Sequence, residues 1–181
     1  MRESSRGSGE GQPCLDAARA GMARLGNDGA WRYEHGFLAL AAWRAAAAFG
    51  DEPLGSRALG YVSALVQPDG RISGYREDEY NLDQVNPGKL LFHAFDASGE
   101  SRYAIAADAV AGQLLRQPRT PSGGYWHKKS CPDQVWLDGL DMAEPFAARY
   151  AAFRPNSGAL DGVAKQFELA EKATREPETG L

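Results

Sequence analysis

Cysteine and histidine are scarce in this sequence, and their scarcity excludes two kinds of site. The 181 residues include two cysteines, Cys14 and Cys131, which are too few and too far apart for a disulfide framework. The three histidines occur in neither an HxxxH nor an HExxH pattern, so we predict no metal site. We also predict no cofactor, because no GxGxxG or Walker-type loop is present. Both thiols are expected to be free, as in a reducing compartment.

Long apolar runs and an excess of basic residues are missing as well. The most apolar stretch, residues 37–50, is too short to cross a bilayer and contains Arg44. Residues 1–13 are polar and lack the apolar region of a secretory signal peptide. The net charge of −4 argues against a nucleic-acid partner, which normally needs a basic face. We therefore predict a cytoplasmic protein with no membrane or nucleic-acid partner.

Helix-forming patterns separated by polar loops make up most of the chain. Residues 1–12 are rich in glycine and serine and are predicted to be a disordered leader, and residues 13–181 to be a single partial catalytic domain. A short hairpin is expected around residues 71–75, and no segment alternates as a core strand does. The fold class is therefore all-α. Helices are predicted over residues 12–25, 36–49, 53–66, 89–95, 100–115, 134–153 and 161–172.

Three polar or aromatic loops recur at a nearly constant interval. With Trp31, Asp83 and Trp136 as markers, the steps are 52 and 53 residues. A period of roughly 50 residues with two helices per unit predicts stacked helical hairpins, with these loops at one end of the stack. The alternative is coincidence in a series of three points.

Asp83 and Asn86 lie in the loop segment YNLDQVNPG, just before a predicted helix. Either residue could belong to a functional site, or it could be the N-cap of that helix, as loop Asp and Asn commonly are. Spacing alone leaves both interpretations open.

A second segment, WHKKSCPDQVWLD, gathers aromatic and charged side chains around Asp138. An acid among tryptophans can have a raised pKa, which a general acid near neutral pH needs. Lysines suit a carboxylated ligand, and tryptophan faces suit sugar rings. The alternative is that Trp136 anchors the core and Asp138 is a first-turn acid favoured by the helix dipole. The candidate site residues here are Trp126, His127, Lys128, Trp136 and Asp138.

Asp83 and Asp138 are 55 residues apart, about one hairpin period. This spacing predicts that they occupy equivalent positions on adjacent hairpins and face one cleft. Acid/base chemistry on a sugar needs such a pair of carboxylates.

Several segments in this order resemble glycoside hydrolase family 105, the unsaturated rhamnogalacturonyl hydrolases, and its sister family 88, the unsaturated glucuronyl hydrolases. The segments are NLDQVNPGKLLF, QLLRQPRT, GGYWHK, PDQVWLDGLDMAEPFAARYA and the terminal TGL. The resemblance implies an (α/α)6 barrel of six helical hairpins, of which this chain supplies about three and a half. The barrel is therefore expected to be truncated to about half.

The resemblance also implies an activity and a set of residue roles. The activity is hydrolysis of the unsaturated uronic acid from the non-reducing end of pectin-derived, rhamnogalacturonan oligosaccharides by vinyl-ether hydration. Asp138 matches the proton donor and Asp83 the assisting carboxylate. His127 and Lys128 match substrate-contacting positions, and Trp136 a ring-contacting one. Trp126 and Asn86, from the same two motifs, complete the predicted substrate-binding set.

The sequence departs from the family pattern at three positions. Cys131 stands where the family commonly has Tyr, Val135 where it has Met, and Asp141 where an aromatic is expected. A carboxylate at Asp141, one helical turn after Asp138, is expected to repel an acidic substrate and to raise the neighbouring pKa.

Further site residues of the family come after the TGL segment, so we expect this chain alone to be weak or inactive. An open barrel edge is also expected to expose Val163, Phe167 and Ala170 and to favour self-association. One alternative is a non-catalytic fragment of such an enzyme. Another is a different (α/α)6 sugar enzyme such as an epimerase, although the presence of both Asp83 and Asp138 favours the hydrolase.

Overall fold

The computed structural model describes residues 11–25, 29–155 and 159–180, and this part of the chain is helical without a named strand. Three short 3₁₀ turns, η1 (Glu77–Glu79), η2 (Leu82–Gln84) and η3 (Asn86–Gly88), lead into α4. None of the described helices combines the length and apolar character needed to cross a bilayer. The helices are α1 (Gln12–Leu25), α2 (Tyr33–Phe49), α3 (Glu52–Leu65), α4 (Lys89–Ser98), α5 (Ser101–Arg116), α6 (Gly139–Phe153) and α7 (Ala159–Thr174).

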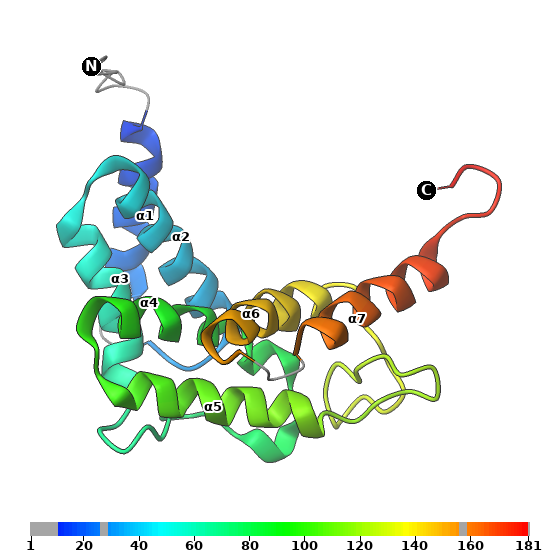
Figure 1. The fold of residues 1–181 in the computed structure, drawn as a ribbon. Coiled ribbons are helices and arrows are strands. Elements are labelled where there is room, and N and C mark those ends of the chain that lie inside the picture. The colour runs from blue at the N-terminus through cyan, green and yellow to red at the C-terminus, as the bar shows by residue number, and fades with distance from the viewer. Residues whose placement is uncertain (1–10, 26–28, 156–158, 181) are drawn as a thin grey trace.

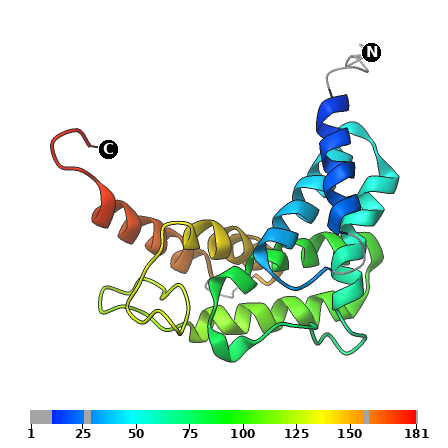
Figure 2. The same ribbon diagram turned by 180° about the vertical axis from the view of Figure 1, so that it is seen from behind.

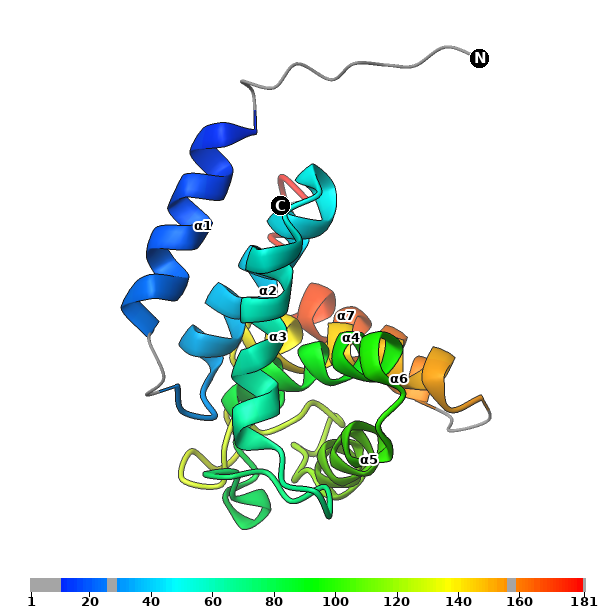
Figure 3. The same cartoon turned by 90° about the vertical axis from the view of Figure 1, so that its left-hand side faces the viewer.

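The helices pair as consecutive hairpins, α2 with α3, α4 with α5 and α6 with α7, as the repeat predicted. Helix α4 contacts α2 on one side and α6 on the other, so these three helices form the inner row. Figures 1 and 3 show α1 to α3 standing together at one end of an open arc, with α4, α5 and α6 beside them and α7 at the other end.

The turns between paired helices follow local sequence rules. Helix α2 ends at Gly50, whose φ of 73° is left-handed and suits glycine. Asp51 then caps α3, its carboxylate accepting a hydrogen bond from the Leu54 backbone N–H, and Pro53 occupies the first turn. Gly99, with φ 70°, ends α4 in the same way as Gly50 ends α2. These signals allow both turns, each of which joins two antiparallel helices, to be predicted from the sequence.

The core lies between the inner row and the outer helices. Its largest fully buried side chains come from α4, α5 and α6, and the rings of Phe92 and Phe146 lie 5.3 Å apart between α4 and α6. Burial of side chains of this size supplies about 1.5–3 kcal/mol each. The arc is therefore held together mainly by apolar packing across its inner row.

Three features of the structure differ from the prediction in ways that bear on the loops, namely the start of α2, the pairing near residue 72 and the start of α6. Helix α2 begins at Tyr33, three residues before the predicted start, so His35 is helical rather than part of a loop. Near the predicted hairpin, an isolated antiparallel bridge pairs Val66 with Ile72, so the chain turns back over residues 67–71, at the start of the predicted range 71–75. The predicted leader lies outside the described residues, apart from residue 11 and residue 12, where α1 begins.

The third difference concerns α6, which begins at Gly139 and not at residue 134. The His127 backbone N–H donates to the Gln134 carbonyl at 2.8 Å, and the Gln134 N–H donates to the Cys131 carbonyl at 3.3 Å. These bonds fold residues 127–134 into a compact loop and prevent the helix from starting earlier. Figure 2 shows this yellow-green loop region beside α7.

Candidate active site

The loops that precede α2, α4 and α6 meet at one end of the arc. The Trp31 indole N–H donates to the Gln84 carbonyl at 2.8 Å, which joins the first loop to the second. The Leu82 backbone N–H donates to the His127 carbonyl at 2.9 Å, which joins the second loop to the third. The common end predicted from the 52- and 53-residue steps is therefore present.

Two buried glutamines hold the second and third loops in place, and the sequence analysis missed both. The Gln117 amide donates to the Tyr80 carbonyl at 2.7 Å and to the Trp126 carbonyl at 2.8 Å. The Gln113 amide donates to the Asn81 carbonyl at 3.2 Å and accepts from the Tyr75 hydroxyl. A glutamine at a core position of amphipathic α5 was the available signal, because a buried amide must find partners.

Neither Asp83 nor Asn86 caps α4, because the N-cap position of that helix is Gly88 and no side chain caps it. Asn81 caps the short turn η2, its side chain accepting from the Asp83 backbone N–H at 3.0 Å. The Asp83 carboxylate is free to bind His127 Nε2 at 3.0 Å and Lys128 Nζ at 3.2 Å. Burial alone raises the pKa of Asp83, but His127 and Lys128 outweigh it and hold the pKa below its usual value. Asp83 is therefore an anion over the neutral pH range.

His127 is the buried centre of the site. Its side chain is fully buried, and its ring is stacked on Trp136 with centroids 4.2 Å apart and planes 11° apart. Lys128 Nζ lies 4.9 Å from the centroid of the same Trp136 ring, a cation–π contact. Trp136 itself is 38% exposed, so it is a partly open platform and not a core anchor.

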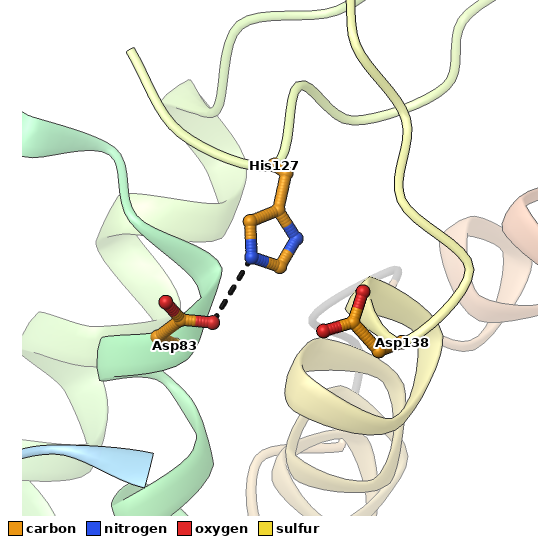
Figure 4. A group of neighbouring side chains, drawn as sticks. All are labelled: Asp83, His127 and Asp138. Carbon is orange, nitrogen blue, oxygen red and sulfur yellow. Dashed lines mark hydrogen bonds and ion pairs between the residues drawn. The ribbon is translucent and has the colours of Figure 1, made fainter. Parts of the chain in front are cut away.

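Asp138 lies at the N-cap position of α6 but makes no capping hydrogen bond through its side chain. Its exposed carboxylate is turned toward Asp83 and His127, as Figure 4 shows. One ligand-capable atom from each of the three side chains lies within 4.8 Å of the others. The two carboxylates therefore share one cleft, as their 55-residue spacing predicted.

The same three side chains offer one nitrogen and two carboxylate oxygens, a set that a metal ion accepts. Asp83 and His127 are already hydrogen-bonded to each other. Two carboxyl groups and an imidazole that face one cleft are the groups that acid/base chemistry uses to give and take a proton. The arrangement is therefore suited to proton transfer.

The neighbouring Asp141 is not the isolated negative charge that the sequence suggested. Lys89 Nζ lies 3.3 Å from the Asp141 carboxylate and donates to the Asp141 carbonyl at 2.7 Å. Burial lowers the pKa of Lys89, and the Asp141 charge opposes that shift. The expected repulsion of an acidic substrate is thus partly offset by a cation 52 residues away in the chain.

Trp126 and Asn86 are two further predicted site residues, outside the group of side chains that Figure 4 draws. The Trp126 indole donates to Asp133 at 3.1 Å. Asn86 is 1% exposed, and neither polar atom of its amide has a partner. Contact of these residues with a substrate stays a prediction. Conversely, Val135 and Leu137, beside Trp136, are 48% and 63% exposed and extend the apolar surface at the site.

The stacked helical hairpins, with two aspartates before neighbouring inner helices, agree with the α-helical barrel of a glycoside hydrolase, and the comparisons with known proteins show that class. The family model for Glycosyl Hydrolase Family 88 matches residues 13–181, and the chain belongs to that family. The chain is also similar to a solved structure from C. acetobutylicum ATCC 824 that is described as a glycoside hydrolase from family 105. That match has 30% identity and a TM-score of 0.83, and it covers 95% of this chain and 47% of the other. The chain thus spans about half the length of that relative and corresponds to about half of its helical barrel.

Proposed function

We propose that the protein hydrolyses 4,5-unsaturated uronic acids from the non-reducing end of pectin-derived oligosaccharides, of the rhamnogalacturonan type, by vinyl-ether hydration. The observation that carries this proposal is the unequal pair of acids. Asp83 is held as an anion by His127 and Lys128, while Asp138 is exposed and has no hydrogen bond as a cap. Asp83 is therefore engaged by its two partners, and Asp138 is the carboxyl in the cleft that is left to exchange a proton with a substrate.

The reaction follows from that difference. Asp138 donates its proton to C4 of the unsaturated ring, and positive charge develops at C5. The Asp138 carboxylate then takes a proton from water as the water oxygen bonds to C5. The resulting hemiketal opens to a ketone at C5 and frees C1 as a hemiacetal, which releases the remaining sugar as an alcohol. One water is consumed, and Asp138 ends protonated, as it began.

The surrounding side chains suit a sugar acid. The partly exposed Trp136 ring provides an apolar platform for a sugar face. Lys128, whose side chain is 25% exposed, supplies positive charge for a uronate carboxylate while it also contacts Asp83. The nearby negative charge of Asp141 is partly offset by Lys89, which reduces its repulsion of an acidic substrate.

The test is loss of the ultraviolet absorbance of the unsaturated uronate, measured with rhamnogalacturonan-derived and glucuronyl oligosaccharides. In a protein that carries the complete helical barrel, we expect Asp138→Asn to lower kcat by about 10²–10⁴-fold while the thermal unfolding curve is unchanged, since an amide cannot donate and recover the proton. Asp83→Asn should lower kcat less. Asp161→Asn, on the exposed side of α7, is the matched control and should behave as the unchanged protein. Normal turnover by Asp138→Asn contradicts the proposed role.

A non-catalytic role is the second candidate, because the chain spans about half the length of the similar family 105 structure. In that case an unsaturated oligosaccharide binds to the chain, as calorimetry can detect, but its absorbance does not decline. A steady decline under the same conditions excludes this alternative.

A further inference from the structure

Gln166 is a buried polar residue of α7 that bonds to the loop leading into the candidate active site. It is 4% exposed. Its side-chain carbonyl accepts from the Tyr125 backbone N–H at 3.0 Å, and its amide donates to the Gly123 carbonyl at 3.1 Å. Residues 126–128, which include His127, follow directly in the chain. Figure 2 shows α7 beside this loop.

The backbone of the loop is paired with itself on one side only. The Trp126 N–H donates to the Pro118 carbonyl at 2.8 Å, next to an isolated antiparallel bridge of Arg119 with Tyr125. In an antiparallel pair the N–H groups of successive residues point alternately toward the partner and away from it. The Tyr125 N–H therefore points away from the paired side, where Gln166 accepts from it.

The two bonds of Gln166 are not equally important. The Gly123 carbonyl also accepts from the Arg119 guanidinium at 3.1 Å, so it keeps a donor if Gln166 is replaced. Tyr125 is 8% exposed, and its N–H donates to Gln166. A buried backbone N–H that loses its acceptor destabilises the arrangement that buries it. Without Gln166, the segment around Tyr125 would have to open toward water.

The bonded segment lies next to the two side chains that hold Asp83. His127 Nε2 and Lys128 Nζ lie 3.0 and 3.2 Å from the Asp83 carboxylate. His127 follows Tyr125 by two residues, and its ring is fully buried and stacked on Trp136. A shift of the Tyr125 backbone therefore displaces a ring that close packing otherwise holds in one place.

We propose that Gln166 is a positioning residue that, through the Tyr125 backbone, fixes residues 126–128 in the site. Gln166 thus supports the loop from α7, as Gln117 supports it from α5. Helix α7 supplies none of the side chains drawn in Figure 4, yet it takes part in their arrangement. The effect of Gln166 on turnover rests on the proposed function, whereas its effect on the loop does not.

Two substitutions of similar length separate hydrogen bonding from packing. Gln166→Met fills the same space without a strong hydrogen-bonding atom. Gln166→Glu keeps an oxygen that accepts from the Tyr125 N–H. At pH 5 a buried glutamate is largely protonated, so it can also donate to the Gly123 carbonyl. Lys165→Met, at the neighbouring exposed position of α7, is the control.

The first measurement is amide hydrogen exchange, followed by NMR at pH 5. We expect Gln166→Met to speed exchange at residues 125–128 by about tenfold relative to α5 amides such as that of Val110. Gln166→Glu and Lys165→Met should exchange as the unsubstituted chain does. Unchanged exchange at residues 125–128 in Gln166→Met overturns the proposal. An equal acceleration in α5 also overturns it, because Gln166 would then support the fold as a whole.

The second measurement reports the side chains of the site. The Trp136 ring, stacked at 4.2 Å between centroids, shifts the proton signals of the His127 ring. We expect Gln166→Met to reduce this shift and Gln166→Glu to retain it. If Gln166→Met leaves the His127 signals unchanged, Gln166 does not position this ring and the proposal is wrong.

Turnover is a separate readout, in a protein that carries the complete helical barrel. There, Gln166→Met should lower kcat/KM for unsaturated uronates by about tenfold, and Gln166→Glu should restore it at pH 5. Neither NMR measurement requires turnover. Absence of activity on every unsaturated oligosaccharide would therefore remove the proposed function and leave the positioning role of Gln166 standing.

Discussion

Glu144 is a buried carboxyl on α6 that takes no part in the proposed reaction. It is 2% exposed, and burial raises its pKa to about 7, with the Arg119 charge opposing that shift. The unfolded chain binds this proton only up to an ordinary glutamate pKa of about 4.3. The folded state therefore binds the proton more tightly than the unfolded state does. This contribution to stability is present at low pH and is lost as pH rises through about 7.

We predict that Glu144→Gln stabilises the protein at pH 8 by about 2 kcal/mol, because the amide carries no charge to desolvate. Near pH 4.5 the two proteins should have nearly equal free energies of unfolding. Urea unfolding at both pH values measures the difference, and Glu168→Gln, on the exposed face of α7, is the control. An equal effect of Glu144→Gln at both pH values contradicts the assignment.

At the scale of elements, the site depends on close packing of α2 against the turn that leads into α4. A Cβ atom added at Gly36 would lie 2.8 Å from the Pro87 Cα and 3.1 Å from the Asn86 side-chain oxygen. The first of these atoms belongs to the backbone and cannot rotate away. Gly36 therefore allows α2 to approach the segment that carries Asp83.

We predict that Gly36→Ala destabilises the protein by about 2 kcal/mol, although alanine is ordinarily the better helix former by about 1 kcal/mol. Gly60→Ala in α3 is the matched control, because nothing lies within 4 Å of the added Cβ, and it should stabilise by up to about 1 kcal/mol. Thermal or urea unfolding measures both. If both substitutions change stability in the same direction, the close approach is not what selects glycine at position 36.

At the scale of the whole molecule, α7 leaves apolar side chains uncovered. Phe167 is 50% exposed and Leu160 is 59% exposed. Of the expected exposed residues, Val163 and Ala170 are only partly exposed, and Val163 packs against the core. Leu160 and Phe167 are seven residues apart, so they lie on one face of the helix and form an exposed apolar stripe.

We predict that the chain self-associates through this stripe, since exposed apolar patches favour burial against another surface. Light scattering after size-exclusion chromatography, over a range of concentrations, should show mass that rises with concentration. Phe167→Asp should suppress the increase, whereas Leu115→Ser, which removes a 75% exposed leucine from α5, should not. A monomer at every concentration contradicts the prediction.

The sequence by itself determined the helices and the pairing of the acids. Residues 12–25 and 100–115 were predicted as helices within one residue of α1 and α5, because apolar periodicity and capping residues act between near neighbours. The spacing of Asp83 and Asp138 predicted one cleft, because equivalent positions of stacked hairpins lie side by side.

Only the tertiary structure decided how the site is assembled. The start of α6 depends on the bond between His127 and Gln134, the partner of Asp141 is Lys89, and the supports of both loops are Gln113 and Gln117. Lys89 and Asp141 lie 52 residues apart in the chain. Local propensity reports only the neighbours of a residue in sequence, whereas a buried donor or charge takes whichever partner the packed helices bring to it.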